Sequence, residues 1–249
     1  MSDFIFDGVS AESMGLRIER YPVIHKPRKR LTTVTVPGRN GSLHLSDGSY
    51  EDIVIRYECW WKNKSSAYST GRTAHEVAQW LYAAPVGARL EDTYDSTVFR
   101  TATFQGPLDI ENILDRYGRV TLEFECRPEA WLKSAETALE FTKSGGFLNN
   151  PTPFATKPLI RVVTDTIHVG GTVRIGAEQL LIMWQGFAAR HEIWVDCEEQ
   201  EAWEIVDGEE VPVNAWISGA DYLQIQPGRN DVTFDNFESV RIYTRAYTL

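Results

Sequence analysis

Histidine and carboxylate side chains are the groups in this sequence that could do chemistry, and their spacing decides which kind. His75-Glu76 begins like the His-Glu-x-x-His helix of zinc enzymes, but position 79 is Gln79, so the second zinc ligand is missing. None of the five histidines lies at metal-ligand spacing from another histidine or from a cysteine. Adjacent acids such as Glu198-Glu199 work as an acid–base pair only where their surroundings separate the two pKa values, and here they lie in a hydrophilic stretch.

Motifs for nucleophiles and cofactors do not occur in the sequence either. There is no Gly-x-Ser-x-Gly elbow, no phosphate-binding Walker A loop and no Gly-x-Gly-x-x-Gly fingerprint. Cys59, Cys126 and Cys197 are too far apart for a Cys-x-x-Cys site, and their odd number excludes a disulfide framework, which indicates a reducing cytoplasm as the place of synthesis. We therefore expect no enzyme activity, no catalytic residue, no cofactor and no metal.

Charge is distributed unevenly along the 249 residues. Residues 1–135 hold 17 Lys+Arg and 18 Asp+Glu, a net charge of −1, whereas residues 136–249 hold 8 and 17, a net charge of −9. The total of −10 argues against nucleic-acid binding by phosphate neutralisation. A basic cluster, His25 to Arg30, contrasts with residues 196–210, which contain acids and no base. Two interpretations are open: these are solvated loops, or they are complementary patches that dock to other subunits.

The elements that must position these groups are mostly β-strands. Apolar and polar residues alternate in 120–126 and 53–60, which is the pattern of antiparallel strands with one buried face. One helix is expected: Thr73 and Glu76 have the spacing of a capping box, an apolar stripe ends at Leu81, and Pro85 stops the helix. Asp47-Gly48 and Asp207-Gly208 are expected to form tight turns, the second within an acidic hairpin over 202–214. The sequence contains no run of about 18 apolar residues, so we expect no membrane span.

The change in charge coincides with residues 144–153, a stretch rich in glycine, asparagine and proline that we expect to be a linker. The fold class is then mainly β: an N-terminal β-sandwich with one α-helix, followed by a second β-sandwich. Most tryptophans of the second half are expected in its core, because tryptophan is buried to a large degree on average; stacking on sugar rings is the alternative use. These tryptophans are Trp184, Trp194, Trp203 and Trp216.

Three segments together resemble a known family. The chain opens with a short aromatic strand, Phe4 to Ser10; a basic segment leads into Val34-Thr35-Val36-Pro37-Gly38; and Leu223 to Asn230 is a strand followed by a Pro-Gly turn. In order, spacing and total length the chain is similar to the distal tail proteins of long-tailed, non-contractile bacteriophages. The stretch from Asn150 to Ile160 resembles the junction between their two domains.

The resemblance implies an architecture and a role. An N-terminal domain, residues 1–140 with the last strand at about 241–249 able to complete it, would form a six-membered ring around the tail channel. A C-terminal galectin-like β-sandwich, residues 155–240, would lie at the periphery. The protein would be a structural virion component at the tail tip, made in the host cytoplasm. Its partners would be its own copies, the tail-tube protein, and the baseplate and receptor-binding proteins, with DNA only passing through.

Arg28, Lys29 and Arg30 are the candidate contact to another subunit or to the tail tube. The alternative function is a carbohydrate-binding β-sandwich protein that recognises a host surface through its second domain. Sugar binding that is lost on replacing a tryptophan of that domain would favour the alternative.

Overall fold

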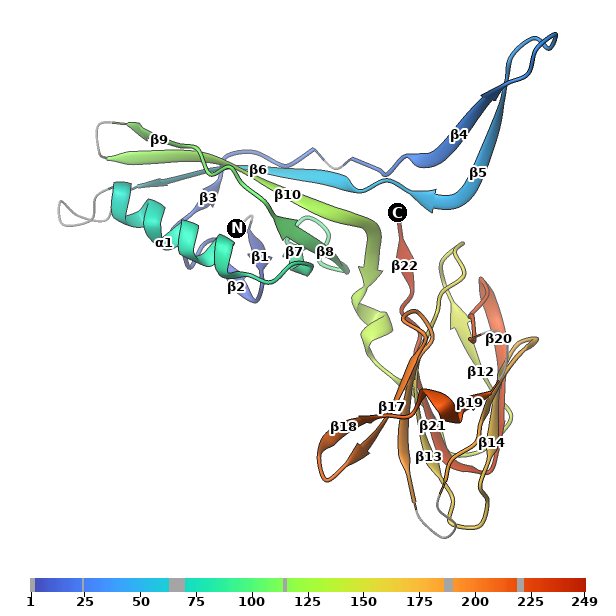
Figure 1. Cartoon of the computed structure of the whole chain (residues 1–249). Helices are drawn as coiled ribbons and strands as arrows, with labels where there is room; N and C mark the ends of the chain where they lie inside the picture. Colours follow the sequence, from blue (N-terminus) through green and yellow to red (C-terminus); the bar gives the residue numbers. More distant parts are fainter. Residues whose placement is uncertain (1–2, 24, 63–69, 114–115, 186–189, 219–221) are drawn as a thin grey trace. The chain divides into compact units, whose positions relative to one another are not determined.

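The computed structural model describes residues 3–23, 25–62, 70–113, 116–185, 190–218 and 222–249. The chain divides into two compact units, Met1–Ala130 together with Leu249, and Trp131–Thr248. Both are built mainly of β-strands, and α1 (Thr70–Ala83) is the α-helix found among the described residues (Figure 1). No helix in the described part of the chain is long and apolar enough to cross a membrane.

The first unit is organised around one antiparallel sheet. Alternation decides which face is buried: along β6 the side chains of Ile53, Ile55 and Tyr57 are buried and those between them are exposed, as the sequence pattern predicts. In sheet order the strands are β2 (Val9–Ser10), β1 (Phe4–Phe6), β7 (Ala88–Asp92), β8 (Val98–Phe104), β10 (Tyr117–Leu132), β6 (Ile53–Lys62) and β3 (Arg17–Ile18), with β9 (Ile110–Ile113) also paired to β10.

This sheet is strongly curled. Strands β1 and β6 are separated by three others, so in a flat sheet they would lie about 19 Å apart. Yet the rings of Phe4 on β1 and Tyr57 on β6 stack with centroids 4.4 Å apart, and Phe6 contacts Phe124 on β10 at 4.8 Å. The first unit is therefore a half-barrel lined with aromatic rings, where the sequence led us to expect two packed sheets. Period-2 alternation marks the buried face of a strand and does not report how far a sheet bends.

Helix α1 packs against the inside of the half-barrel. Val77 and Leu81 are buried in the same core as the aromatic rings, and the Trp80 indole N–H donates to the Phe6 carbonyl at 3.2 Å. The predicted capping box is wrong. Because α1 begins at Thr70, Thr73 lies within the helix, and the Glu76 carboxylate accepts a hydrogen bond from Arg72 at 3.1 Å.

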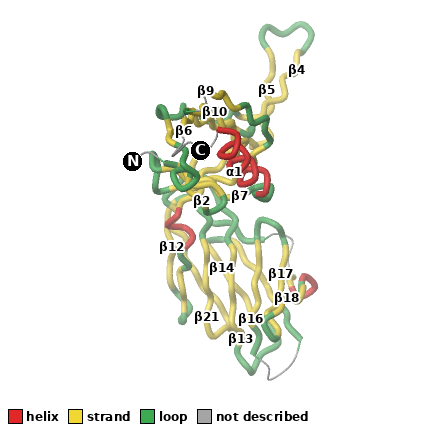
Figure 2. The backbone as a smooth tube through the Cα atoms, turned by 90° about the vertical axis from the view of Figure 1, so that its left-hand side faces the viewer, coloured by secondary structure: helices red, strands yellow, loops and turns green. Residues whose placement is uncertain are grey.

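The second unit is a sandwich of two antiparallel sheets (Figure 2). The first sheet has the order β11 (Leu139–Phe141), β21 (Phe237–Tyr243), β13 (Leu159–Thr164), β16 (Glu192–Asp196), β17 (Glu201–Val206) and β18 (Glu209–Pro212). The second has the order β12 (Gly146–Asn150), β20 (Gly228–Asp235), β14 (Gly171–Ile175), β15 (Glu178–Ile182) and β19 (Ile217–Ser218). Short 3₁₀ turns cover Lys133–Glu136 and Asn214–Trp216, and the terminal strand β22 (Tyr247–Thr248) pairs with β10.

One hydrophobic core lies between these two sheets. Ile160 and Val162 of the first sheet pack with Val173 and Ile175 of the second, all almost completely buried. The expected acidic hairpin is confirmed: β17 and β18 pair, and Asp207 and Gly208 between them both have positive φ, 54° and 87°.

The segment expected to be a linker is partly a strand of this sandwich. Residues 146–150 form β12, which pairs with β20. The glycine there is required by packing, because a Cβ on Gly146 would lie 2.5 Å from the Phe141 ring. Asn150 is buried, and its side-chain oxygen accepts hydrogen bonds from the Thr152 amide and hydroxyl at 3.0 and 2.9 Å. Turn-forming residues therefore serve here to shape a sheet edge.

Candidate interaction site

A β-hairpin outside both hydrophobic cores is the most exposed structure of the first unit. It consists of β4 (Lys29–Thr35) and β5 (Ser42–Tyr50), which pair with each other in a two-stranded sheet of their own. Every residue of β4 and the first seven of β5 are exposed, and the ribbon extends away from the rest of its unit (Figures 1 and 2). A two-stranded hairpin is marginally stable by itself in water, and no other described strand pairs with this one.

The register gives the hairpin two different faces. Val34 pairs with Leu43 and Thr32 with Leu45, so one face carries an apolar stripe. Leu45, at 51% exposure, is the most open member of that stripe. The opposite face is mostly polar: Thr33 pairs with His44 and their side chains are 3.1 Å apart, while Thr35 pairs with Ser42 and Leu31 with Ser46.

This stripe is a candidate contact surface that sequence reasoning missed. The alternation of Val34 with threonines was visible and predicted a strand. The second strand was not predicted, because Asp47-Gly48 indicated a turn, whereas the structure places both residues inside β5. The pairing shifts register between Lys29 and Leu31, so β4 and β5 are irregular at this point.

The predicted contact residues lie at the base of the hairpin. Lys29 pairs with Tyr50, the Glu51 amide donates to the Arg28 carbonyl at 2.8 Å, and Arg30 falls at the shift in register. All three cations are exposed, and none forms an ion pair with another residue of the described chain. The nearby Asp47 has a lowered pKa, chiefly because the Ser49 amide and hydroxyl donate to its carboxylate. The basic side chains therefore remain free to meet an acidic partner.

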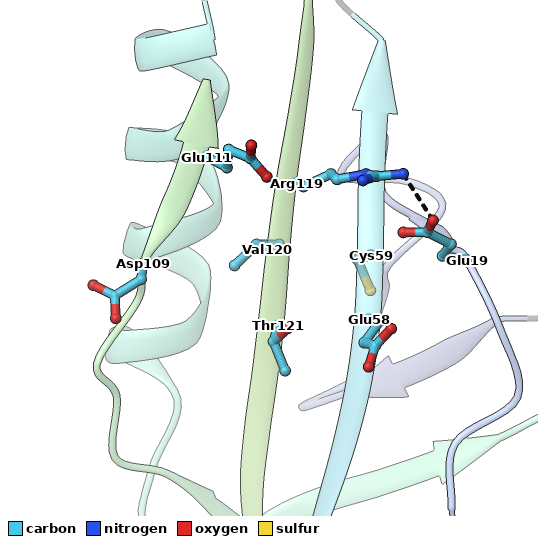
Figure 3. Close-up of a pocket in the computed structure, with 8 residues that line it drawn as sticks. All are labelled: Glu19, Glu58, Cys59, Asp109, Glu111, Arg119, Val120 and Thr121. Atoms are coloured by element: carbon cyan, nitrogen blue, oxygen red, sulfur yellow. Dashed lines mark hydrogen bonds and ion pairs between the residues drawn. The ribbon is translucent and has the colours of Figure 1, made fainter. Parts of the chain in front are cut away.

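A shallow depression of about 280 Å³ lies beside β6, β9 and β10 of the first unit (Figure 3). Its carboxylates are largely neutralised within the chain: Arg119 donates to Glu19 at 2.8 Å, and Arg20 pairs with Glu58. The other lining acids, Asp109 and Glu111, face solvent. The depression therefore presents two ion-paired and two solvent-facing carboxylates.

Groups able to do covalent or metal chemistry are held in structural roles. Among the described residues no cluster of three or more His, Cys, Asp or Glu side chains could hold a metal ion. Burial raises the thiol pKa of Cys59, Cys126 and Cys197 to about 12, which keeps them protonated and unreactive. The prediction that Cys59 and Cys126 lie on the inward faces of their strands is confirmed.

Two histidine–carboxylate pairs were not foreseen from the sequence. His191 Nδ1 lies 2.5 Å from a Glu204 carboxylate oxygen, and His168 Nδ1 lies 2.6 Å from Asp165. A catalytic triad needs a nucleophile on the second imidazole nitrogen. His191 Nε2 is buried with no hydrogen-bond partner among the described residues. The His191–Glu204 pair thus links the residue just before β16 to β17.

Comparison with known proteins shows that this chain shares its fold with solved structures at low sequence identity. No family model matches the chain, and no curated protein is detectably similar in sequence. The fold matches that of the Dit protein of phage SPP1, described as a hub adsorption apparatus in phages infecting Gram-positive bacteria, over 100% of both chains, with a TM-score of 0.76 and 13% identity. It also matches two structures of the phage p2 baseplate in its activated conformation, one with Sr and one with Ca, over 97% of both chains, with TM-scores of 0.57 and identities of 8% and 7%. The expected resemblance to phage distal tail proteins is thereby confirmed as a shared fold along the whole chain.

Proposed function

We propose that this protein is a structural hub at the tip of a phage tail. Six copies form a ring through their first units, join the tail tube to the baseplate and carry the adhesion proteins. The shared fold with a phage hub protein over the full length of both chains supports this role. The second unit, a two-sheet sandwich, is galectin-like in this proposal and lies at the periphery, and the protein resides in the virion.

The observation that carries the proposal is the exposed amphipathic hairpin. Its apolar stripe of Val34, Leu43 and Leu45 has no cover in the described chain, which makes a monomer the less stable form in water. A ring provides each hairpin with a neighbouring copy and leaves no hairpin uncovered when it closes. The near-neutral first half, with 17 basic and 18 acidic residues, allows identical units to approach with little repulsion.

The basic base of the hairpin fits the same assembly. Arg28, Lys29 and Arg30 are exposed and form no ion pair within the part of the chain that the structure describes, so a neighbouring subunit or the tail tube can supply the carboxylates. Lys26, just before them, donates to the terminal Leu249 carbonyl oxygen at 2.5 Å, so its charge is already engaged. We infer that the three following cations make the intermolecular contact.

Light scattering and electron microscopy of the purified protein, alone and with the tail-tube protein, test the proposal. We expect a species of six times 28.3 kDa and a ring with a central hole.

Leu45→Glu on the apolar stripe should abolish the ring, whereas His44→Glu on the opposite face should keep it. Glu replacements of Arg28, Lys29 and Arg30 together should weaken assembly, and charge-conserving Arg28→Lys with Arg30→Lys should not. A stable dimer without larger species would contradict the ring.

A further inference from the structure

The solvent-facing side of one sheet in the second unit carries a row of aromatic rings. Trp194 on β16 and Trp203 on β17 are direct cross-strand partners, with centroids 6.2 Å apart and planes 3° from parallel. Tyr243 on β21 continues the row, 6.0 Å from Trp194 and tilted by 24°. The neighbours of Trp194 along its strand, Ile193 and Val195, are completely buried. The three rings therefore lie on the opposite face from the core.

These rings contrast with the other tryptophans of the second unit. Trp184 is 3% exposed in the core, and Trp216 packs against the same core, as expected for tryptophan in a sandwich. The expectation that most of the four tryptophans lie in the core is thus not met: Trp184 and Trp216 pack there, and Trp194 and Trp203 do not. Alternation explains the difference: Trp184 lies in an apolar run, whereas Trp194 and Trp203 occupy outward positions of β16 and β17.

Polar groups beside the rings are already fixed in place. Arg161 makes two hydrogen bonds to the Glu192 carboxylate, one of them at 2.7 Å, and its guanidinium lies 5.9 Å from the Trp194 ring centroid. The Trp194 indole N–H donates to the same carboxylate at 3.1 Å. Hydrogen bonding to Arg161 lowers the pKa of Glu192, so the carboxylate remains an acceptor at neutral pH. A ligand would meet a preorganised surface without having to order it.

We propose that this face, formed by Trp194, Trp203, Tyr243, Arg161 and Glu192, binds a neutral oligosaccharide. The apolar C–H face of a pyranose stacks on an aromatic ring, and its hydroxyls exchange hydrogen bonds with a guanidinium and a carboxylate at the ring's edge. A row of near-parallel rings about 6 Å apart suits a chain of such sugars. This inference goes beyond the hub role and does not depend on ring formation.

Two observations favour a neutral sugar over other ligands. Residues 136–249 hold 8 basic and 17 acidic residues, and the neighbouring β17–β18 hairpin is acidic, so an anionic polymer would be repelled. The aromatic row is bordered by the ion pairs Arg161–Glu192 and Arg241–Glu140. A protein interface core instead needs a broad patch with few charged residues.

Binding can be measured by titrating the full-length protein with cellohexaose, chitohexaose and a β-galactan hexasaccharide, using calorimetry and tryptophan fluorescence. We expect saturable binding of at least one of them and none of an anionic hexasaccharide such as oligogalacturonate. Trp194→Ala or Trp203→Ala should weaken binding by about tenfold or more, while Trp203→Phe, which retains an aromatic face, should have a small effect.

Trp60→Ala provides a matched control, because Trp60 is a half-buried tryptophan on the outer face of β6 in the other unit. It should leave the dissociation constant unchanged, and circular dichroism should show that every variant is folded. Failure of all three neutral hexasaccharides to saturate at millimolar concentration would overturn the proposal. Equal affinity of the Trp194→Ala variant, or preference for the anionic sugar, would do so too. None of these outcomes bears on the ring, which light scattering tests separately.

Discussion

The Asp196 carboxylate shows how a single ion pair can hold the C-terminal segment of the second unit. Arg245 donates to its two oxygens at 2.7 and 2.6 Å, and the Glu198 and Glu199 amides donate to one of them. Burial by itself would raise the pKa of Asp196, but Arg245 and these amides lower it below the ordinary value of 3.8. A lowered pKa in the folded state stabilises the protein above the unfolded pKa, and this contribution is lost as the pH falls through the folded value.

We therefore expect Asp196→Asn to lower the free energy of unfolding by about 2 kcal/mol at pH 7. The difference from wild type should shrink as the pH falls below the ordinary aspartate pKa, because the unfolded carboxylate is protonated first and the folded carboxylate only at lower pH. Urea unfolding at a series of pH values measures both effects. Asp231→Asn is the matched control, because its pair with Arg229 is exposed and should be worth less than about 0.5 kcal/mol. A pH-independent difference would contradict the assignment.

A glycine and a tryptophan share one cross-strand site in the first unit. Gly118 on β10 pairs with Trp61 on β6, and a Cβ on Gly118 would lie 2.1 Å from the buried Trp61 ring. Gly118→Ala should therefore destabilise the first unit by about 1–3 kcal/mol through overpacking. Thr121→Ala, exposed on the same strand, should change stability by less than about 0.5 kcal/mol. Thermal unfolding of the two variants measures the difference.

Helix α1 is stabilised by burial of its apolar face and not by an N-terminal capping box. Leu81 is 1% exposed in the core, whereas Glu76 is half exposed and contacts Arg72 on the same helix. Leu81→Ala should lower the free energy of unfolding by about 2–5 kcal/mol, and Glu76→Ala by less than about 0.5 kcal/mol. Chemical denaturation of both variants compares them. A loss near 1 kcal/mol for Glu76→Ala would instead indicate the capping box read from the sequence.

Local patterns in the sequence predicted those features that depend on neighbours along the chain. Alternation placed Cys59 and Cys126 on buried faces, and Asp207-Gly208 marked the turn of the acidic hairpin. Features set by distant partners were not predictable in this way. The curl of the sheet in the first unit depends on the contact between Phe4 and Tyr57. The outward position of Trp194 depends on which face of β16 packs against the other sheet of the second unit. The apolar stripe of β4–β5 depends on register, and register requires a partner strand.

At the scale of the whole molecule, assembly should depend on the β4–β5 hairpin as an arm. Replacing residues 31–46 with a short Asn-Gly turn removes the apolar stripe while leaving both hydrophobic cores intact, since none of the removed residues is buried. We expect a folded monomer with unchanged thermal unfolding of both units and no ring in electron micrographs. Removing only the outer pair Val206 and Glu209 of the β17–β18 hairpin should leave assembly unchanged, because that hairpin belongs to the second unit. A ring that survives loss of the β4–β5 arm would show that other surfaces of the first unit close it.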